Sequence, residues 1–160
     1  MALGDNTLQA ARGNQNPGRN PYMVQTVLNW ATALSDKGSA LAASDVVPVI
    51  AVPKGTMVMN AGIEVDTASD GSTFTVDLGM VDADVFVDGF DATSAAAVVA
   101  QNPAAYQPVM AVADDNIDVT IATLSGGAVS SGKLRVWAVL MDCTDMGDMA
   151  ANEVDRDTLA

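Results

Sequence analysis

The amino-acid sequence predicts an all-β fold, an antiparallel β-sandwich of jelly-roll type with an extended N-terminal arm. About eight short apolar stretches follow one another at intervals of roughly 8–15 residues, and turn-forming residues fill nearly every gap. No amphipathic stretch long enough for a crossover helix separates them, which excludes a parallel α/β fold. Two packed antiparallel sheets are the simplest arrangement that buries these stretches.

The chain of 160 residues is long enough for one domain with its own core. We expect an extended N-terminal arm at residues 1–21, a β-sandwich domain at residues 22–142 and an acidic C-terminal extension at residues 143–160. The second half of the arm is rich in Gly, Asn and Pro, and the arm has no clear strand or helix periodicity.

Period-two alternation predicts the first strands. Residues 27–34 alternate between larger and smaller side chains, so we expect a strand there. Residues 46–52 are apolar on both faces, as in a central strand, while Pro48 indicates an edge or a bulge. In residues 56–66, apolar side chains that should face the core alternate with polar ones. The expected buried set is Met57, Met59, Ala61, Ile63 and Val65.

The second half of the domain continues with turns and short strands. Asp70-Gly71 predicts a hairpin turn that leads into a strand over residues 73–78 with one apolar face. The acid-rich residues 80–94 predict loops around a short strand, and residues 94–101 a single helical turn. Further strands are expected at residues 109–112, 117–121 and 134–140.

Charge is distributed unevenly along the chain. Seven Lys and Arg against 20 Asp and Glu give a net charge of −13. This balance opposes direct binding to nucleic acids, because phosphate contacts need clustered Lys and Arg. No Lys or Arg lies between Gly55 and Gly132, a stretch that holds eleven acidic residues. We therefore expect an acidic body whose few positive charges lie outside it.

The composition also excludes the commonest catalytic sites, so we predict that the protein is not an enzyme. The chain has no histidine, which removes Ser-His and Cys-His pairs and the commonest zinc ligand. Cys143 is the only cysteine and cannot form an intrachain disulfide, and its acidic neighbour Asp142 disfavours a reactive thiolate. A hydrolase acting through two carboxylates is disfavoured, because seven aromatic residues offer few walls for a sugar site.

Residues 127–133, Gly-Ala-Val-Ser-Ser-Gly-Lys, come close to the spacing of a phosphate-binding loop. That motif needs Ser or Thr after the lysine, where Leu134 stands here. It also needs a following helix whose N-terminus faces the phosphate, and a strand is predicted instead. We interpret the segment as a Gly-Ser hairpin loop.

Four aspartates in the predicted loop region form a candidate calcium site: Asp82, Asp84, Asp88 and Asp91. Hard oxygen ligands at close spacing can hold Ca²⁺. The segment departs from an EF-hand loop, because it lacks a bidentate Glu at the right offset and flanking helices. A solvated acidic loop is the alternative interpretation. No other cofactor is expected.

The first residues show no basic stretch followed by an apolar run, so no signal peptide is predicted. No run of about 18 apolar residues predicts a membrane span. Together with the single cysteine, these features indicate a protein made in a reducing cytoplasm.

Three stretches resemble small virion structural proteins of tailed bacteriophages, especially head decoration (cement) proteins. They are DVVPVIAVPKGTMVMNAGIEVDTASDGSTFTVDLG, ADVFVDGFDA and GKLRVWAVLMD. The likeness extends over about residues 22–142 and is nearest to proteins of marine and cyanobacterial phages. It implies a protein made in the host cytoplasm that binds the outside of an icosahedral capsid. Such a protein would contact the major capsid protein, form homotrimers and stiffen the shell against internal DNA pressure.

The basic residues that precede the acidic body are the candidates for docking onto acidic patches of such a shell. They are Arg12, Arg19, Lys37 and Lys54. The alternative function is a head or tail fibre module that contacts host surface glycans. An exposed tryptophan would favour it, but Trp30 and Trp137 lie in strand patterns typical of a core or an interface.

Overall fold

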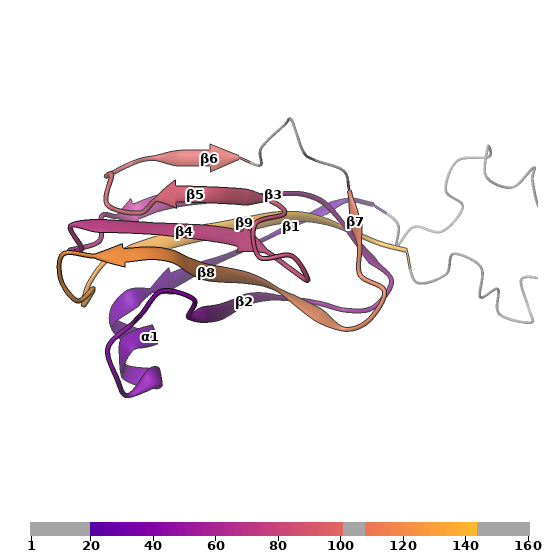
Figure 1. Ribbon diagram of the computed structural model, residues 1–160. Helices are drawn as coiled ribbons and strands as arrows, with labels where there is room; N and C mark the ends of the chain where they lie inside the picture. The colour runs from indigo at the N-terminus through magenta and orange to yellow at the C-terminus, as the bar shows by residue number, and fades with distance from the viewer. Residues whose placement is uncertain (1–19, 101–107, 144–160) are drawn as a thin grey trace, which may run out of the picture.

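The computed structural model describes residues 20–100 and 108–143, and this part of the chain folds into a β-sandwich (Figure 1). The boundaries of the predicted arm and acidic extension stay predictions, because nearly all of both segments lies outside the described residues. Within the described ranges, no helix is long and apolar enough to cross a membrane.

The described residues form nine strands and one helix. They are β1 (Tyr22–Asn29), α1 (Trp30–Lys37), β2 (Val46–Val52), β3 (Thr56–Thr67), β4 (Thr73–Gly79), β5 (Val87–Asp91), β6 (Val98–Ala100), β7 (Val109–Met110), β8 (Asp115–Ser125) and β9 (Lys133–Asp142). In Figure 1, α1 lies at one end of the sandwich and β7 at the other.

The strands form two antiparallel sheets. Sheet A has the order β1-β9-β3-β6, with β7 also pairing with β3, and sheet B has the order β2-β8-β4-β5. If the two-residue β7 is set aside, the first strand pairs with the last, the second with the next to last, and so on inward. A long antiparallel ribbon rolled up in this way is a jelly roll. The topology therefore confirms the predicted fold.

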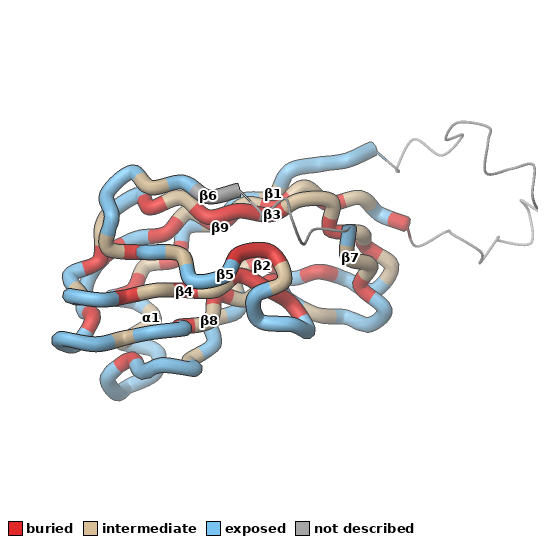
Figure 2. Tube along the Cα trace, turned by 45° about the horizontal axis from the view of Figure 1, so that its top comes forward, coloured by how far each residue is buried: buried red, intermediate tan, exposed pale blue. Residues whose placement is uncertain are grey.

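The core lies between the sheets and is lined by every second residue of the long strands, as the alternating colours in Figure 2 show. In β4, Phe74, Val76 and Leu78 are fully buried, which confirms the predicted alternation. The Phe74 ring meets the buried Trp30 indole edge to face, with 4.8 Å between ring centroids and planes at 78°. This aromatic pair joins sheet B to the start of α1.

Helix α1 is a correction, because the predicted strand over residues 27–34 ends at Asn29. The Asn29 side chain caps the helix by accepting a hydrogen bond from the Ala31 backbone N–H at 3.0 Å. Gly38 ends the helix in the left-handed conformation, at φ 69°. These two caps favour a helical turn over the weak period-two pattern of the same residues.

Strand β3 contains a bulge that makes the predicted facing wrong in its first half. Its register against β9 shifts between Val58 and Asn60. An extra residue reverses the alternation, so Met57 and Met59, which we expected to be buried, are half-buried while Val58 is fully buried. Beyond the bulge the predicted residues are buried: Ala61, Ile63 and Val65.

Strand β2 lies at the edge of sheet B, so the expectation of a central strand is wrong. Its pairing with β8 is irregular between Pro48 and Ile50. Because proline has no N–H to donate to a neighbouring strand, it is found at edges and bulges. The edge position and irregular register of β2 confirm the prediction made from Pro48.

Two predicted local structures are also wrong. Asp70-Gly71 is not a hairpin turn, because β3 and β4 lie in different sheets and the loop crosses between them. The helical turn predicted at residues 94–101 is absent from its described part, residues 94–100, since turns at residues 92–96 lead into β6. Ala96 adopts a left-handed φ of 57°, which breaks any helical path there.

We predict that Phe74→Ala lowers the free energy of unfolding by about 3–5 kcal/mol, because it removes a fully buried ring and its contact with Trp30. Urea denaturation measures the change. Phe90→Ala in β5 is the matched control and should cost less, since Phe90 is only partly buried. An equal loss for both variants would contradict the assignment of Phe74 to the centre of the core.

Candidate interaction surface

The outward face of sheet B is polar and acidic over its central strands β4 and β8, while its edge strand β2 exposes Val46, Pro48 and Ala51. Its four strands contain no Lys or Arg. Burial and the nearby charge of Asp115 raise the pKa of Asp118 on this face. The outward side chains of the two central strands are short hydroxyls and carboxylates: Thr73, Thr75, Asp77, Asp118, Thr120 and Thr123. A face of this kind remains hydrated and offers little apolar area for a protein contact.

The outward face of sheet A is apolar over much of its length. On β1, Met23 is 61% exposed and Val27 is 50% exposed. In the strand register, Met57 lies opposite Met141 of β9 and Met110 of β7. The half-buried apolar residues of this face are Met57, Met59, Trp137, Val139 and Met141. Exposed apolar surface of this extent is typical of a site of protein contact.

An arginine lies between two acids near the other end of this face. Arg135 of β9 donates to Glu64 and to Asp66 of β3, each at 3.1 Å. All three side chains are more than a third exposed, so each pair stabilises the fold by at most about 1 kcal/mol. Both carboxylates of this cluster bind Arg135. The outward face of sheet A is therefore apolar near β7 and charged near α1.

Sequence reasoning missed this apolar face, because the predicted alternation placed Met57 and Met59 in the core. A signal was available in β9, whose residues are apolar on both faces over residues 136–141. The inward residues of β9 are buried in the core. Its outward apolar residues therefore indicate either that another part of a protein covers this strand or that the strand lies in a contact surface.

The predicted docking residues do not come together in the described part of the chain. Arg12 and Arg19 lie outside it. Lys54 is exposed in the turn between β2 and β3, while Lys37 lies at the end of α1, before β2. The two lysines are thus at opposite ends of β2.

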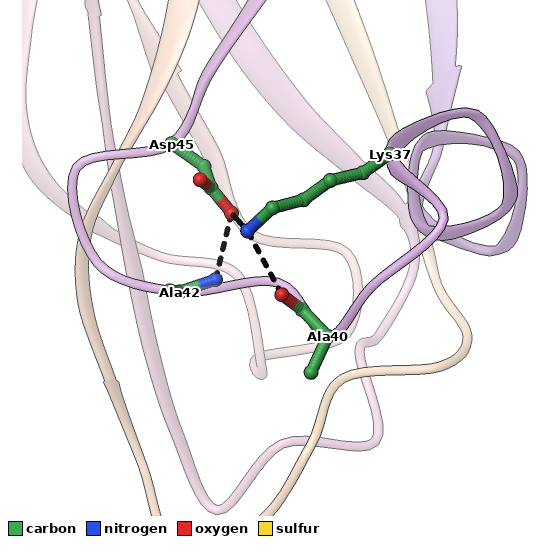
Figure 3. A network of polar contacts seen from close by, with 4 residues as sticks. All are labelled: Lys37, Ala40, Ala42 and Asp45. Carbon is green, nitrogen blue, oxygen red and sulfur yellow. Dashed lines mark hydrogen bonds and ion pairs between the residues drawn. The ribbon is translucent and has the colours of Figure 1, made fainter.

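Lys37 is engaged in a contact within the chain (Figure 3). Its Nζ donates to the Asp45 carboxylate and, at 2.8 Å, to the carbonyl oxygen of Ala40. Asp45 also accepts a hydrogen bond from the Ala42 N–H at 2.7 Å. The hydrogen bond from Lys37 is the main cause that lowers the pKa of Asp45. This network holds the loop between α1 and β2.

The loop that resembled a phosphate-binding motif receives a carboxylate of the chain itself. Asp70 accepts hydrogen bonds from the backbone N–H groups of Ser130 at 2.9 Å and Ser131 at 3.1 Å, and from the Ser130 hydroxyl. These bonds hold the pKa of Asp70 well below its ordinary value. The loop joins β8 of sheet B to β9 of sheet A, so its interpretation as a hairpin loop is wrong.

The four aspartates of the candidate calcium site fall into separate arrangements. Asp82 lies beside Asp84, whose hydrogen bond and charge raise the pKa of Asp82. Asp91 instead accepts hydrogen bonds from the turn that follows it, which lower its pKa. Asp88 is exposed on β5. Across residues 20–100 and 108–143, no three or more His, Cys, Asp or Glu side chains are grouped to hold a metal. The calcium site stays a prediction.

No protein-family model matches the chain, and no curated protein matches its sequence. Among solved structures, a chain of the capsid of Ralstonia phage GP4 is similar, with 15% identity and a TM-score of 0.58 over 78% of this chain and 86% of that one. A chain of the capsid asymmetric unit of cyanophage Pam1 is also similar, with 14% identity and a TM-score of 0.60 over 82% of this chain and 91% of that one. The fold is one found in phage capsids.

We predict that Asp70→Asn lowers the free energy of unfolding at pH 7 and has a smaller effect in acid. Because the pKa of Asp70 is lower in the folded chain, its stabilisation is present above the ordinary value of 3.8 and is lost as the pH falls through the folded value. Urea denaturation at pH 7 and at about pH 2.5 measures the difference. Asp88→Asn, which changes an exposed carboxylate on β5, is the control. An effect of Asp70→Asn on stability that is independent of pH would show that the charged Asp70 carboxylate does not stabilise the loop.

Proposed function

We propose that the protein is a structural component of a phage virion, a decoration (cement) protein that binds the outer surface of the capsid and stabilises it. The observation that carries the proposal is the jelly roll that the chain shares, over most of its length, with chains of two phage capsids. The composition agrees with a structural role, because without histidine the chain lacks the usual general base and zinc ligand. We expect no catalytic activity.

The contrast between the two outward faces supports a defined orientation on a shell. The acidic face of sheet B suits a surface turned toward solvent, since its carboxylates repel other acidic surfaces and nucleic acid. The apolar face of sheet A suits contacts with protein. In this proposal the major capsid protein is the principal partner of the chain.

The N-terminal arm and Lys54 are the proposed docking elements. Tyr22 pairs with Leu140, and Thr56 pairs with Asp142, so β1 begins at the end of sheet A where the Lys54 turn lies. Arg12 and Arg19 precede this point in the sequence. In this proposal the basic residues of the arm and Lys54 bind acidic patches on the shell. Lys37 takes no part in this docking site, because it lies at the other end of β2, bound to Asp45.

The homotrimer and the position on the capsid surface remain predictions that rest on the family resemblance. An exposed tryptophan would favour the alternative of a fibre module that contacts host glycans. Trp30 is fully buried and Trp137 is half-buried, so the described residues offer little support for it.

Mass spectrometry of purified virions tests the proposed function. We expect the protein in hundreds of copies per particle, on the order of the copy number of the major capsid protein, because a cement protein binds a repeated site on the shell. Imaging of the same particles should place its density outside the shell. Absence of the protein from the virions would contradict the proposal.

We further predict that removal of residues 1–21 abolishes binding to shells that lack the protein and leaves the sandwich folded. Co-sedimentation with such shells measures binding, and circular dichroism checks the fold. Lys54→Ala should weaken binding, whereas Lys133→Ala, an exposed cation at the start of β9, is the matched control and should not. Unimpaired binding of the truncated chain would rule out docking through the arm.

A further inference from the structure

Strand β1 is an edge strand without the usual protection against pairing with another chain. In the described chain, the edges of the two sheets are β1, β2, β5, β6 and the two-residue β7. Strand β2 has Pro48 and an irregular register, β5 carries Asp88 and Asp91, and β6 has three residues. Proline, charge, irregularity and short length all oppose the addition of a further strand. Strand β1 has eight residues, YMVQTVLN, with no proline, glycine or charge and an unbroken register against β9.

The side chains of β1 are also incompletely covered on both faces. On the outward face, Met23 and Val27 are at least half exposed, and Tyr22, which lies opposite the inward residue Leu140, is 44% exposed on the other face. On the inward face, Val24 and Thr26 are only half-buried, although they point toward the core. A strand added along the free edge would cover apolar atoms on both faces as well as pair the free backbone groups.

The sequence of β1 is complementary to itself. In an antiparallel pair, residues directly opposite each other lie on the same face of the sheet. If two copies meet with Gln25 on a two-fold axis, Met23 of one copy lies opposite Val27 of the other. The two Gln25 amides then face each other and can exchange hydrogen bonds. With Thr26 on the axis, Gln25 would instead oppose Val27, which is a worse match.

Charge favours the same meeting point. Each chain carries a net charge of −13, so two copies repel one another over most of their surfaces. The outward β9 residues that lie beside β1 are Val139, Trp137, Arg135 and Lys133. The charged residues beside the strand on this face are therefore two cations, of which Arg135 already binds Glu64 and Asp66. Two copies can therefore meet along β1 without placing carboxylates opposite each other.

We propose that two copies of this chain pair antiparallel through β1, with Gln25 on the two-fold axis, and join their two A sheets into one continuous sheet. The apolar faces of both copies then form a single larger surface. The contact is smaller than a standard interface of about 1,600 Å², so it is weak in dilute solution and is strengthened where a shell holds copies close together. This contact needs no capsid and goes beyond the proposed function.

Disulfide trapping in the full-length chain tests the register. Gln25→Cys should form a covalent dimer of twice the 16.4 kDa chain mass under mild oxidation, because opposite Cβ atoms lie about 4.5–5.5 Å apart. Met23→Cys alone should not, since its two copies would be about 13 Å apart, four residues along the strand. Met23→Cys mixed with Val27→Cys should cross-link. The wild-type chain, with its buried Cys143, gives the background.

Charged substitutions of Gln25 test the pairing without a covalent bond. Gln25→Lys and Gln25→Glu should each raise the dimer dissociation constant several-fold, because like charges then lie directly opposite, and a mixture of the two should restore the dimer. Analytical ultracentrifugation of the isolated protein measures the mass. Thr123→Lys, on the outward face of sheet B, is the matched control and should leave the dimer unchanged.

Two outcomes would overturn the pairing. One is the absence of a covalent dimer for Gln25→Cys above the wild-type background. The other is a trimer whose mass none of the Gln25 substitutions alters, which would support the predicted homotrimer instead. Both measurements use the protein without capsids, so either outcome leaves the shell-binding function to its own tests.

Discussion

The antiparallel pairing of β9 with both β1 and β3 is the constraint on which the rest of the sandwich depends. Strand β9 is the last strand of the described chain, yet it lies between β1 and β3 in sheet A. Its inward residues are almost completely buried and form the side of the core that faces sheet B. Without β9, β1 would have no partner strand in the described chain and the core would be open to water. Tyr22 pairs with Leu140, so this closure spans nearly the whole sandwich and makes folding dependent on long-range contacts.

The same strand gives the two outward faces of the molecule their contrast. Strand β9 is apolar on both faces over much of its length, so sheet A is apolar outside as well as inside. The central strands of sheet B, β4 and β8, leave hydroxyls and carboxylates outside. A molecule with one apolar and one acidic face has a preferred way to lie against other proteins, since burying the acidic face would cost the desolvation of several carboxylates. The proposed capsid docking and the proposed β1 pairing both use the apolar side.

Sequence reasoning succeeded where the alternation is regular and failed where one residue interrupts it. The facing of Phe74, Val76 and Leu78 was predicted correctly, because β4 holds its alternation through these positions. Met57 and Met59 were assigned to the wrong face, because the bulge inserts one extra residue into β3 and no local sequence pattern reveals it. Helix α1 was taken for a strand because its eight residues are too few to separate a period of 2 from one of 3.6.

For the candidate interaction surface, the sequence shows which residues are charged but not where they lie on the folded molecule. The amino-acid sequence itself establishes an all-β class, an acidic body, the absence of histidine and the small number of Lys and Arg residues, because these follow from residue types and their local order. The tertiary structure alone decided that Lys37 is tied to Asp45 and that β1 is an unprotected edge. It also decided that the methionines of sheet A face outward. Edges, partners and outward faces arise from strand pairing between distant residues, and a local pattern of side chains carries no record of which strand will lie beside it.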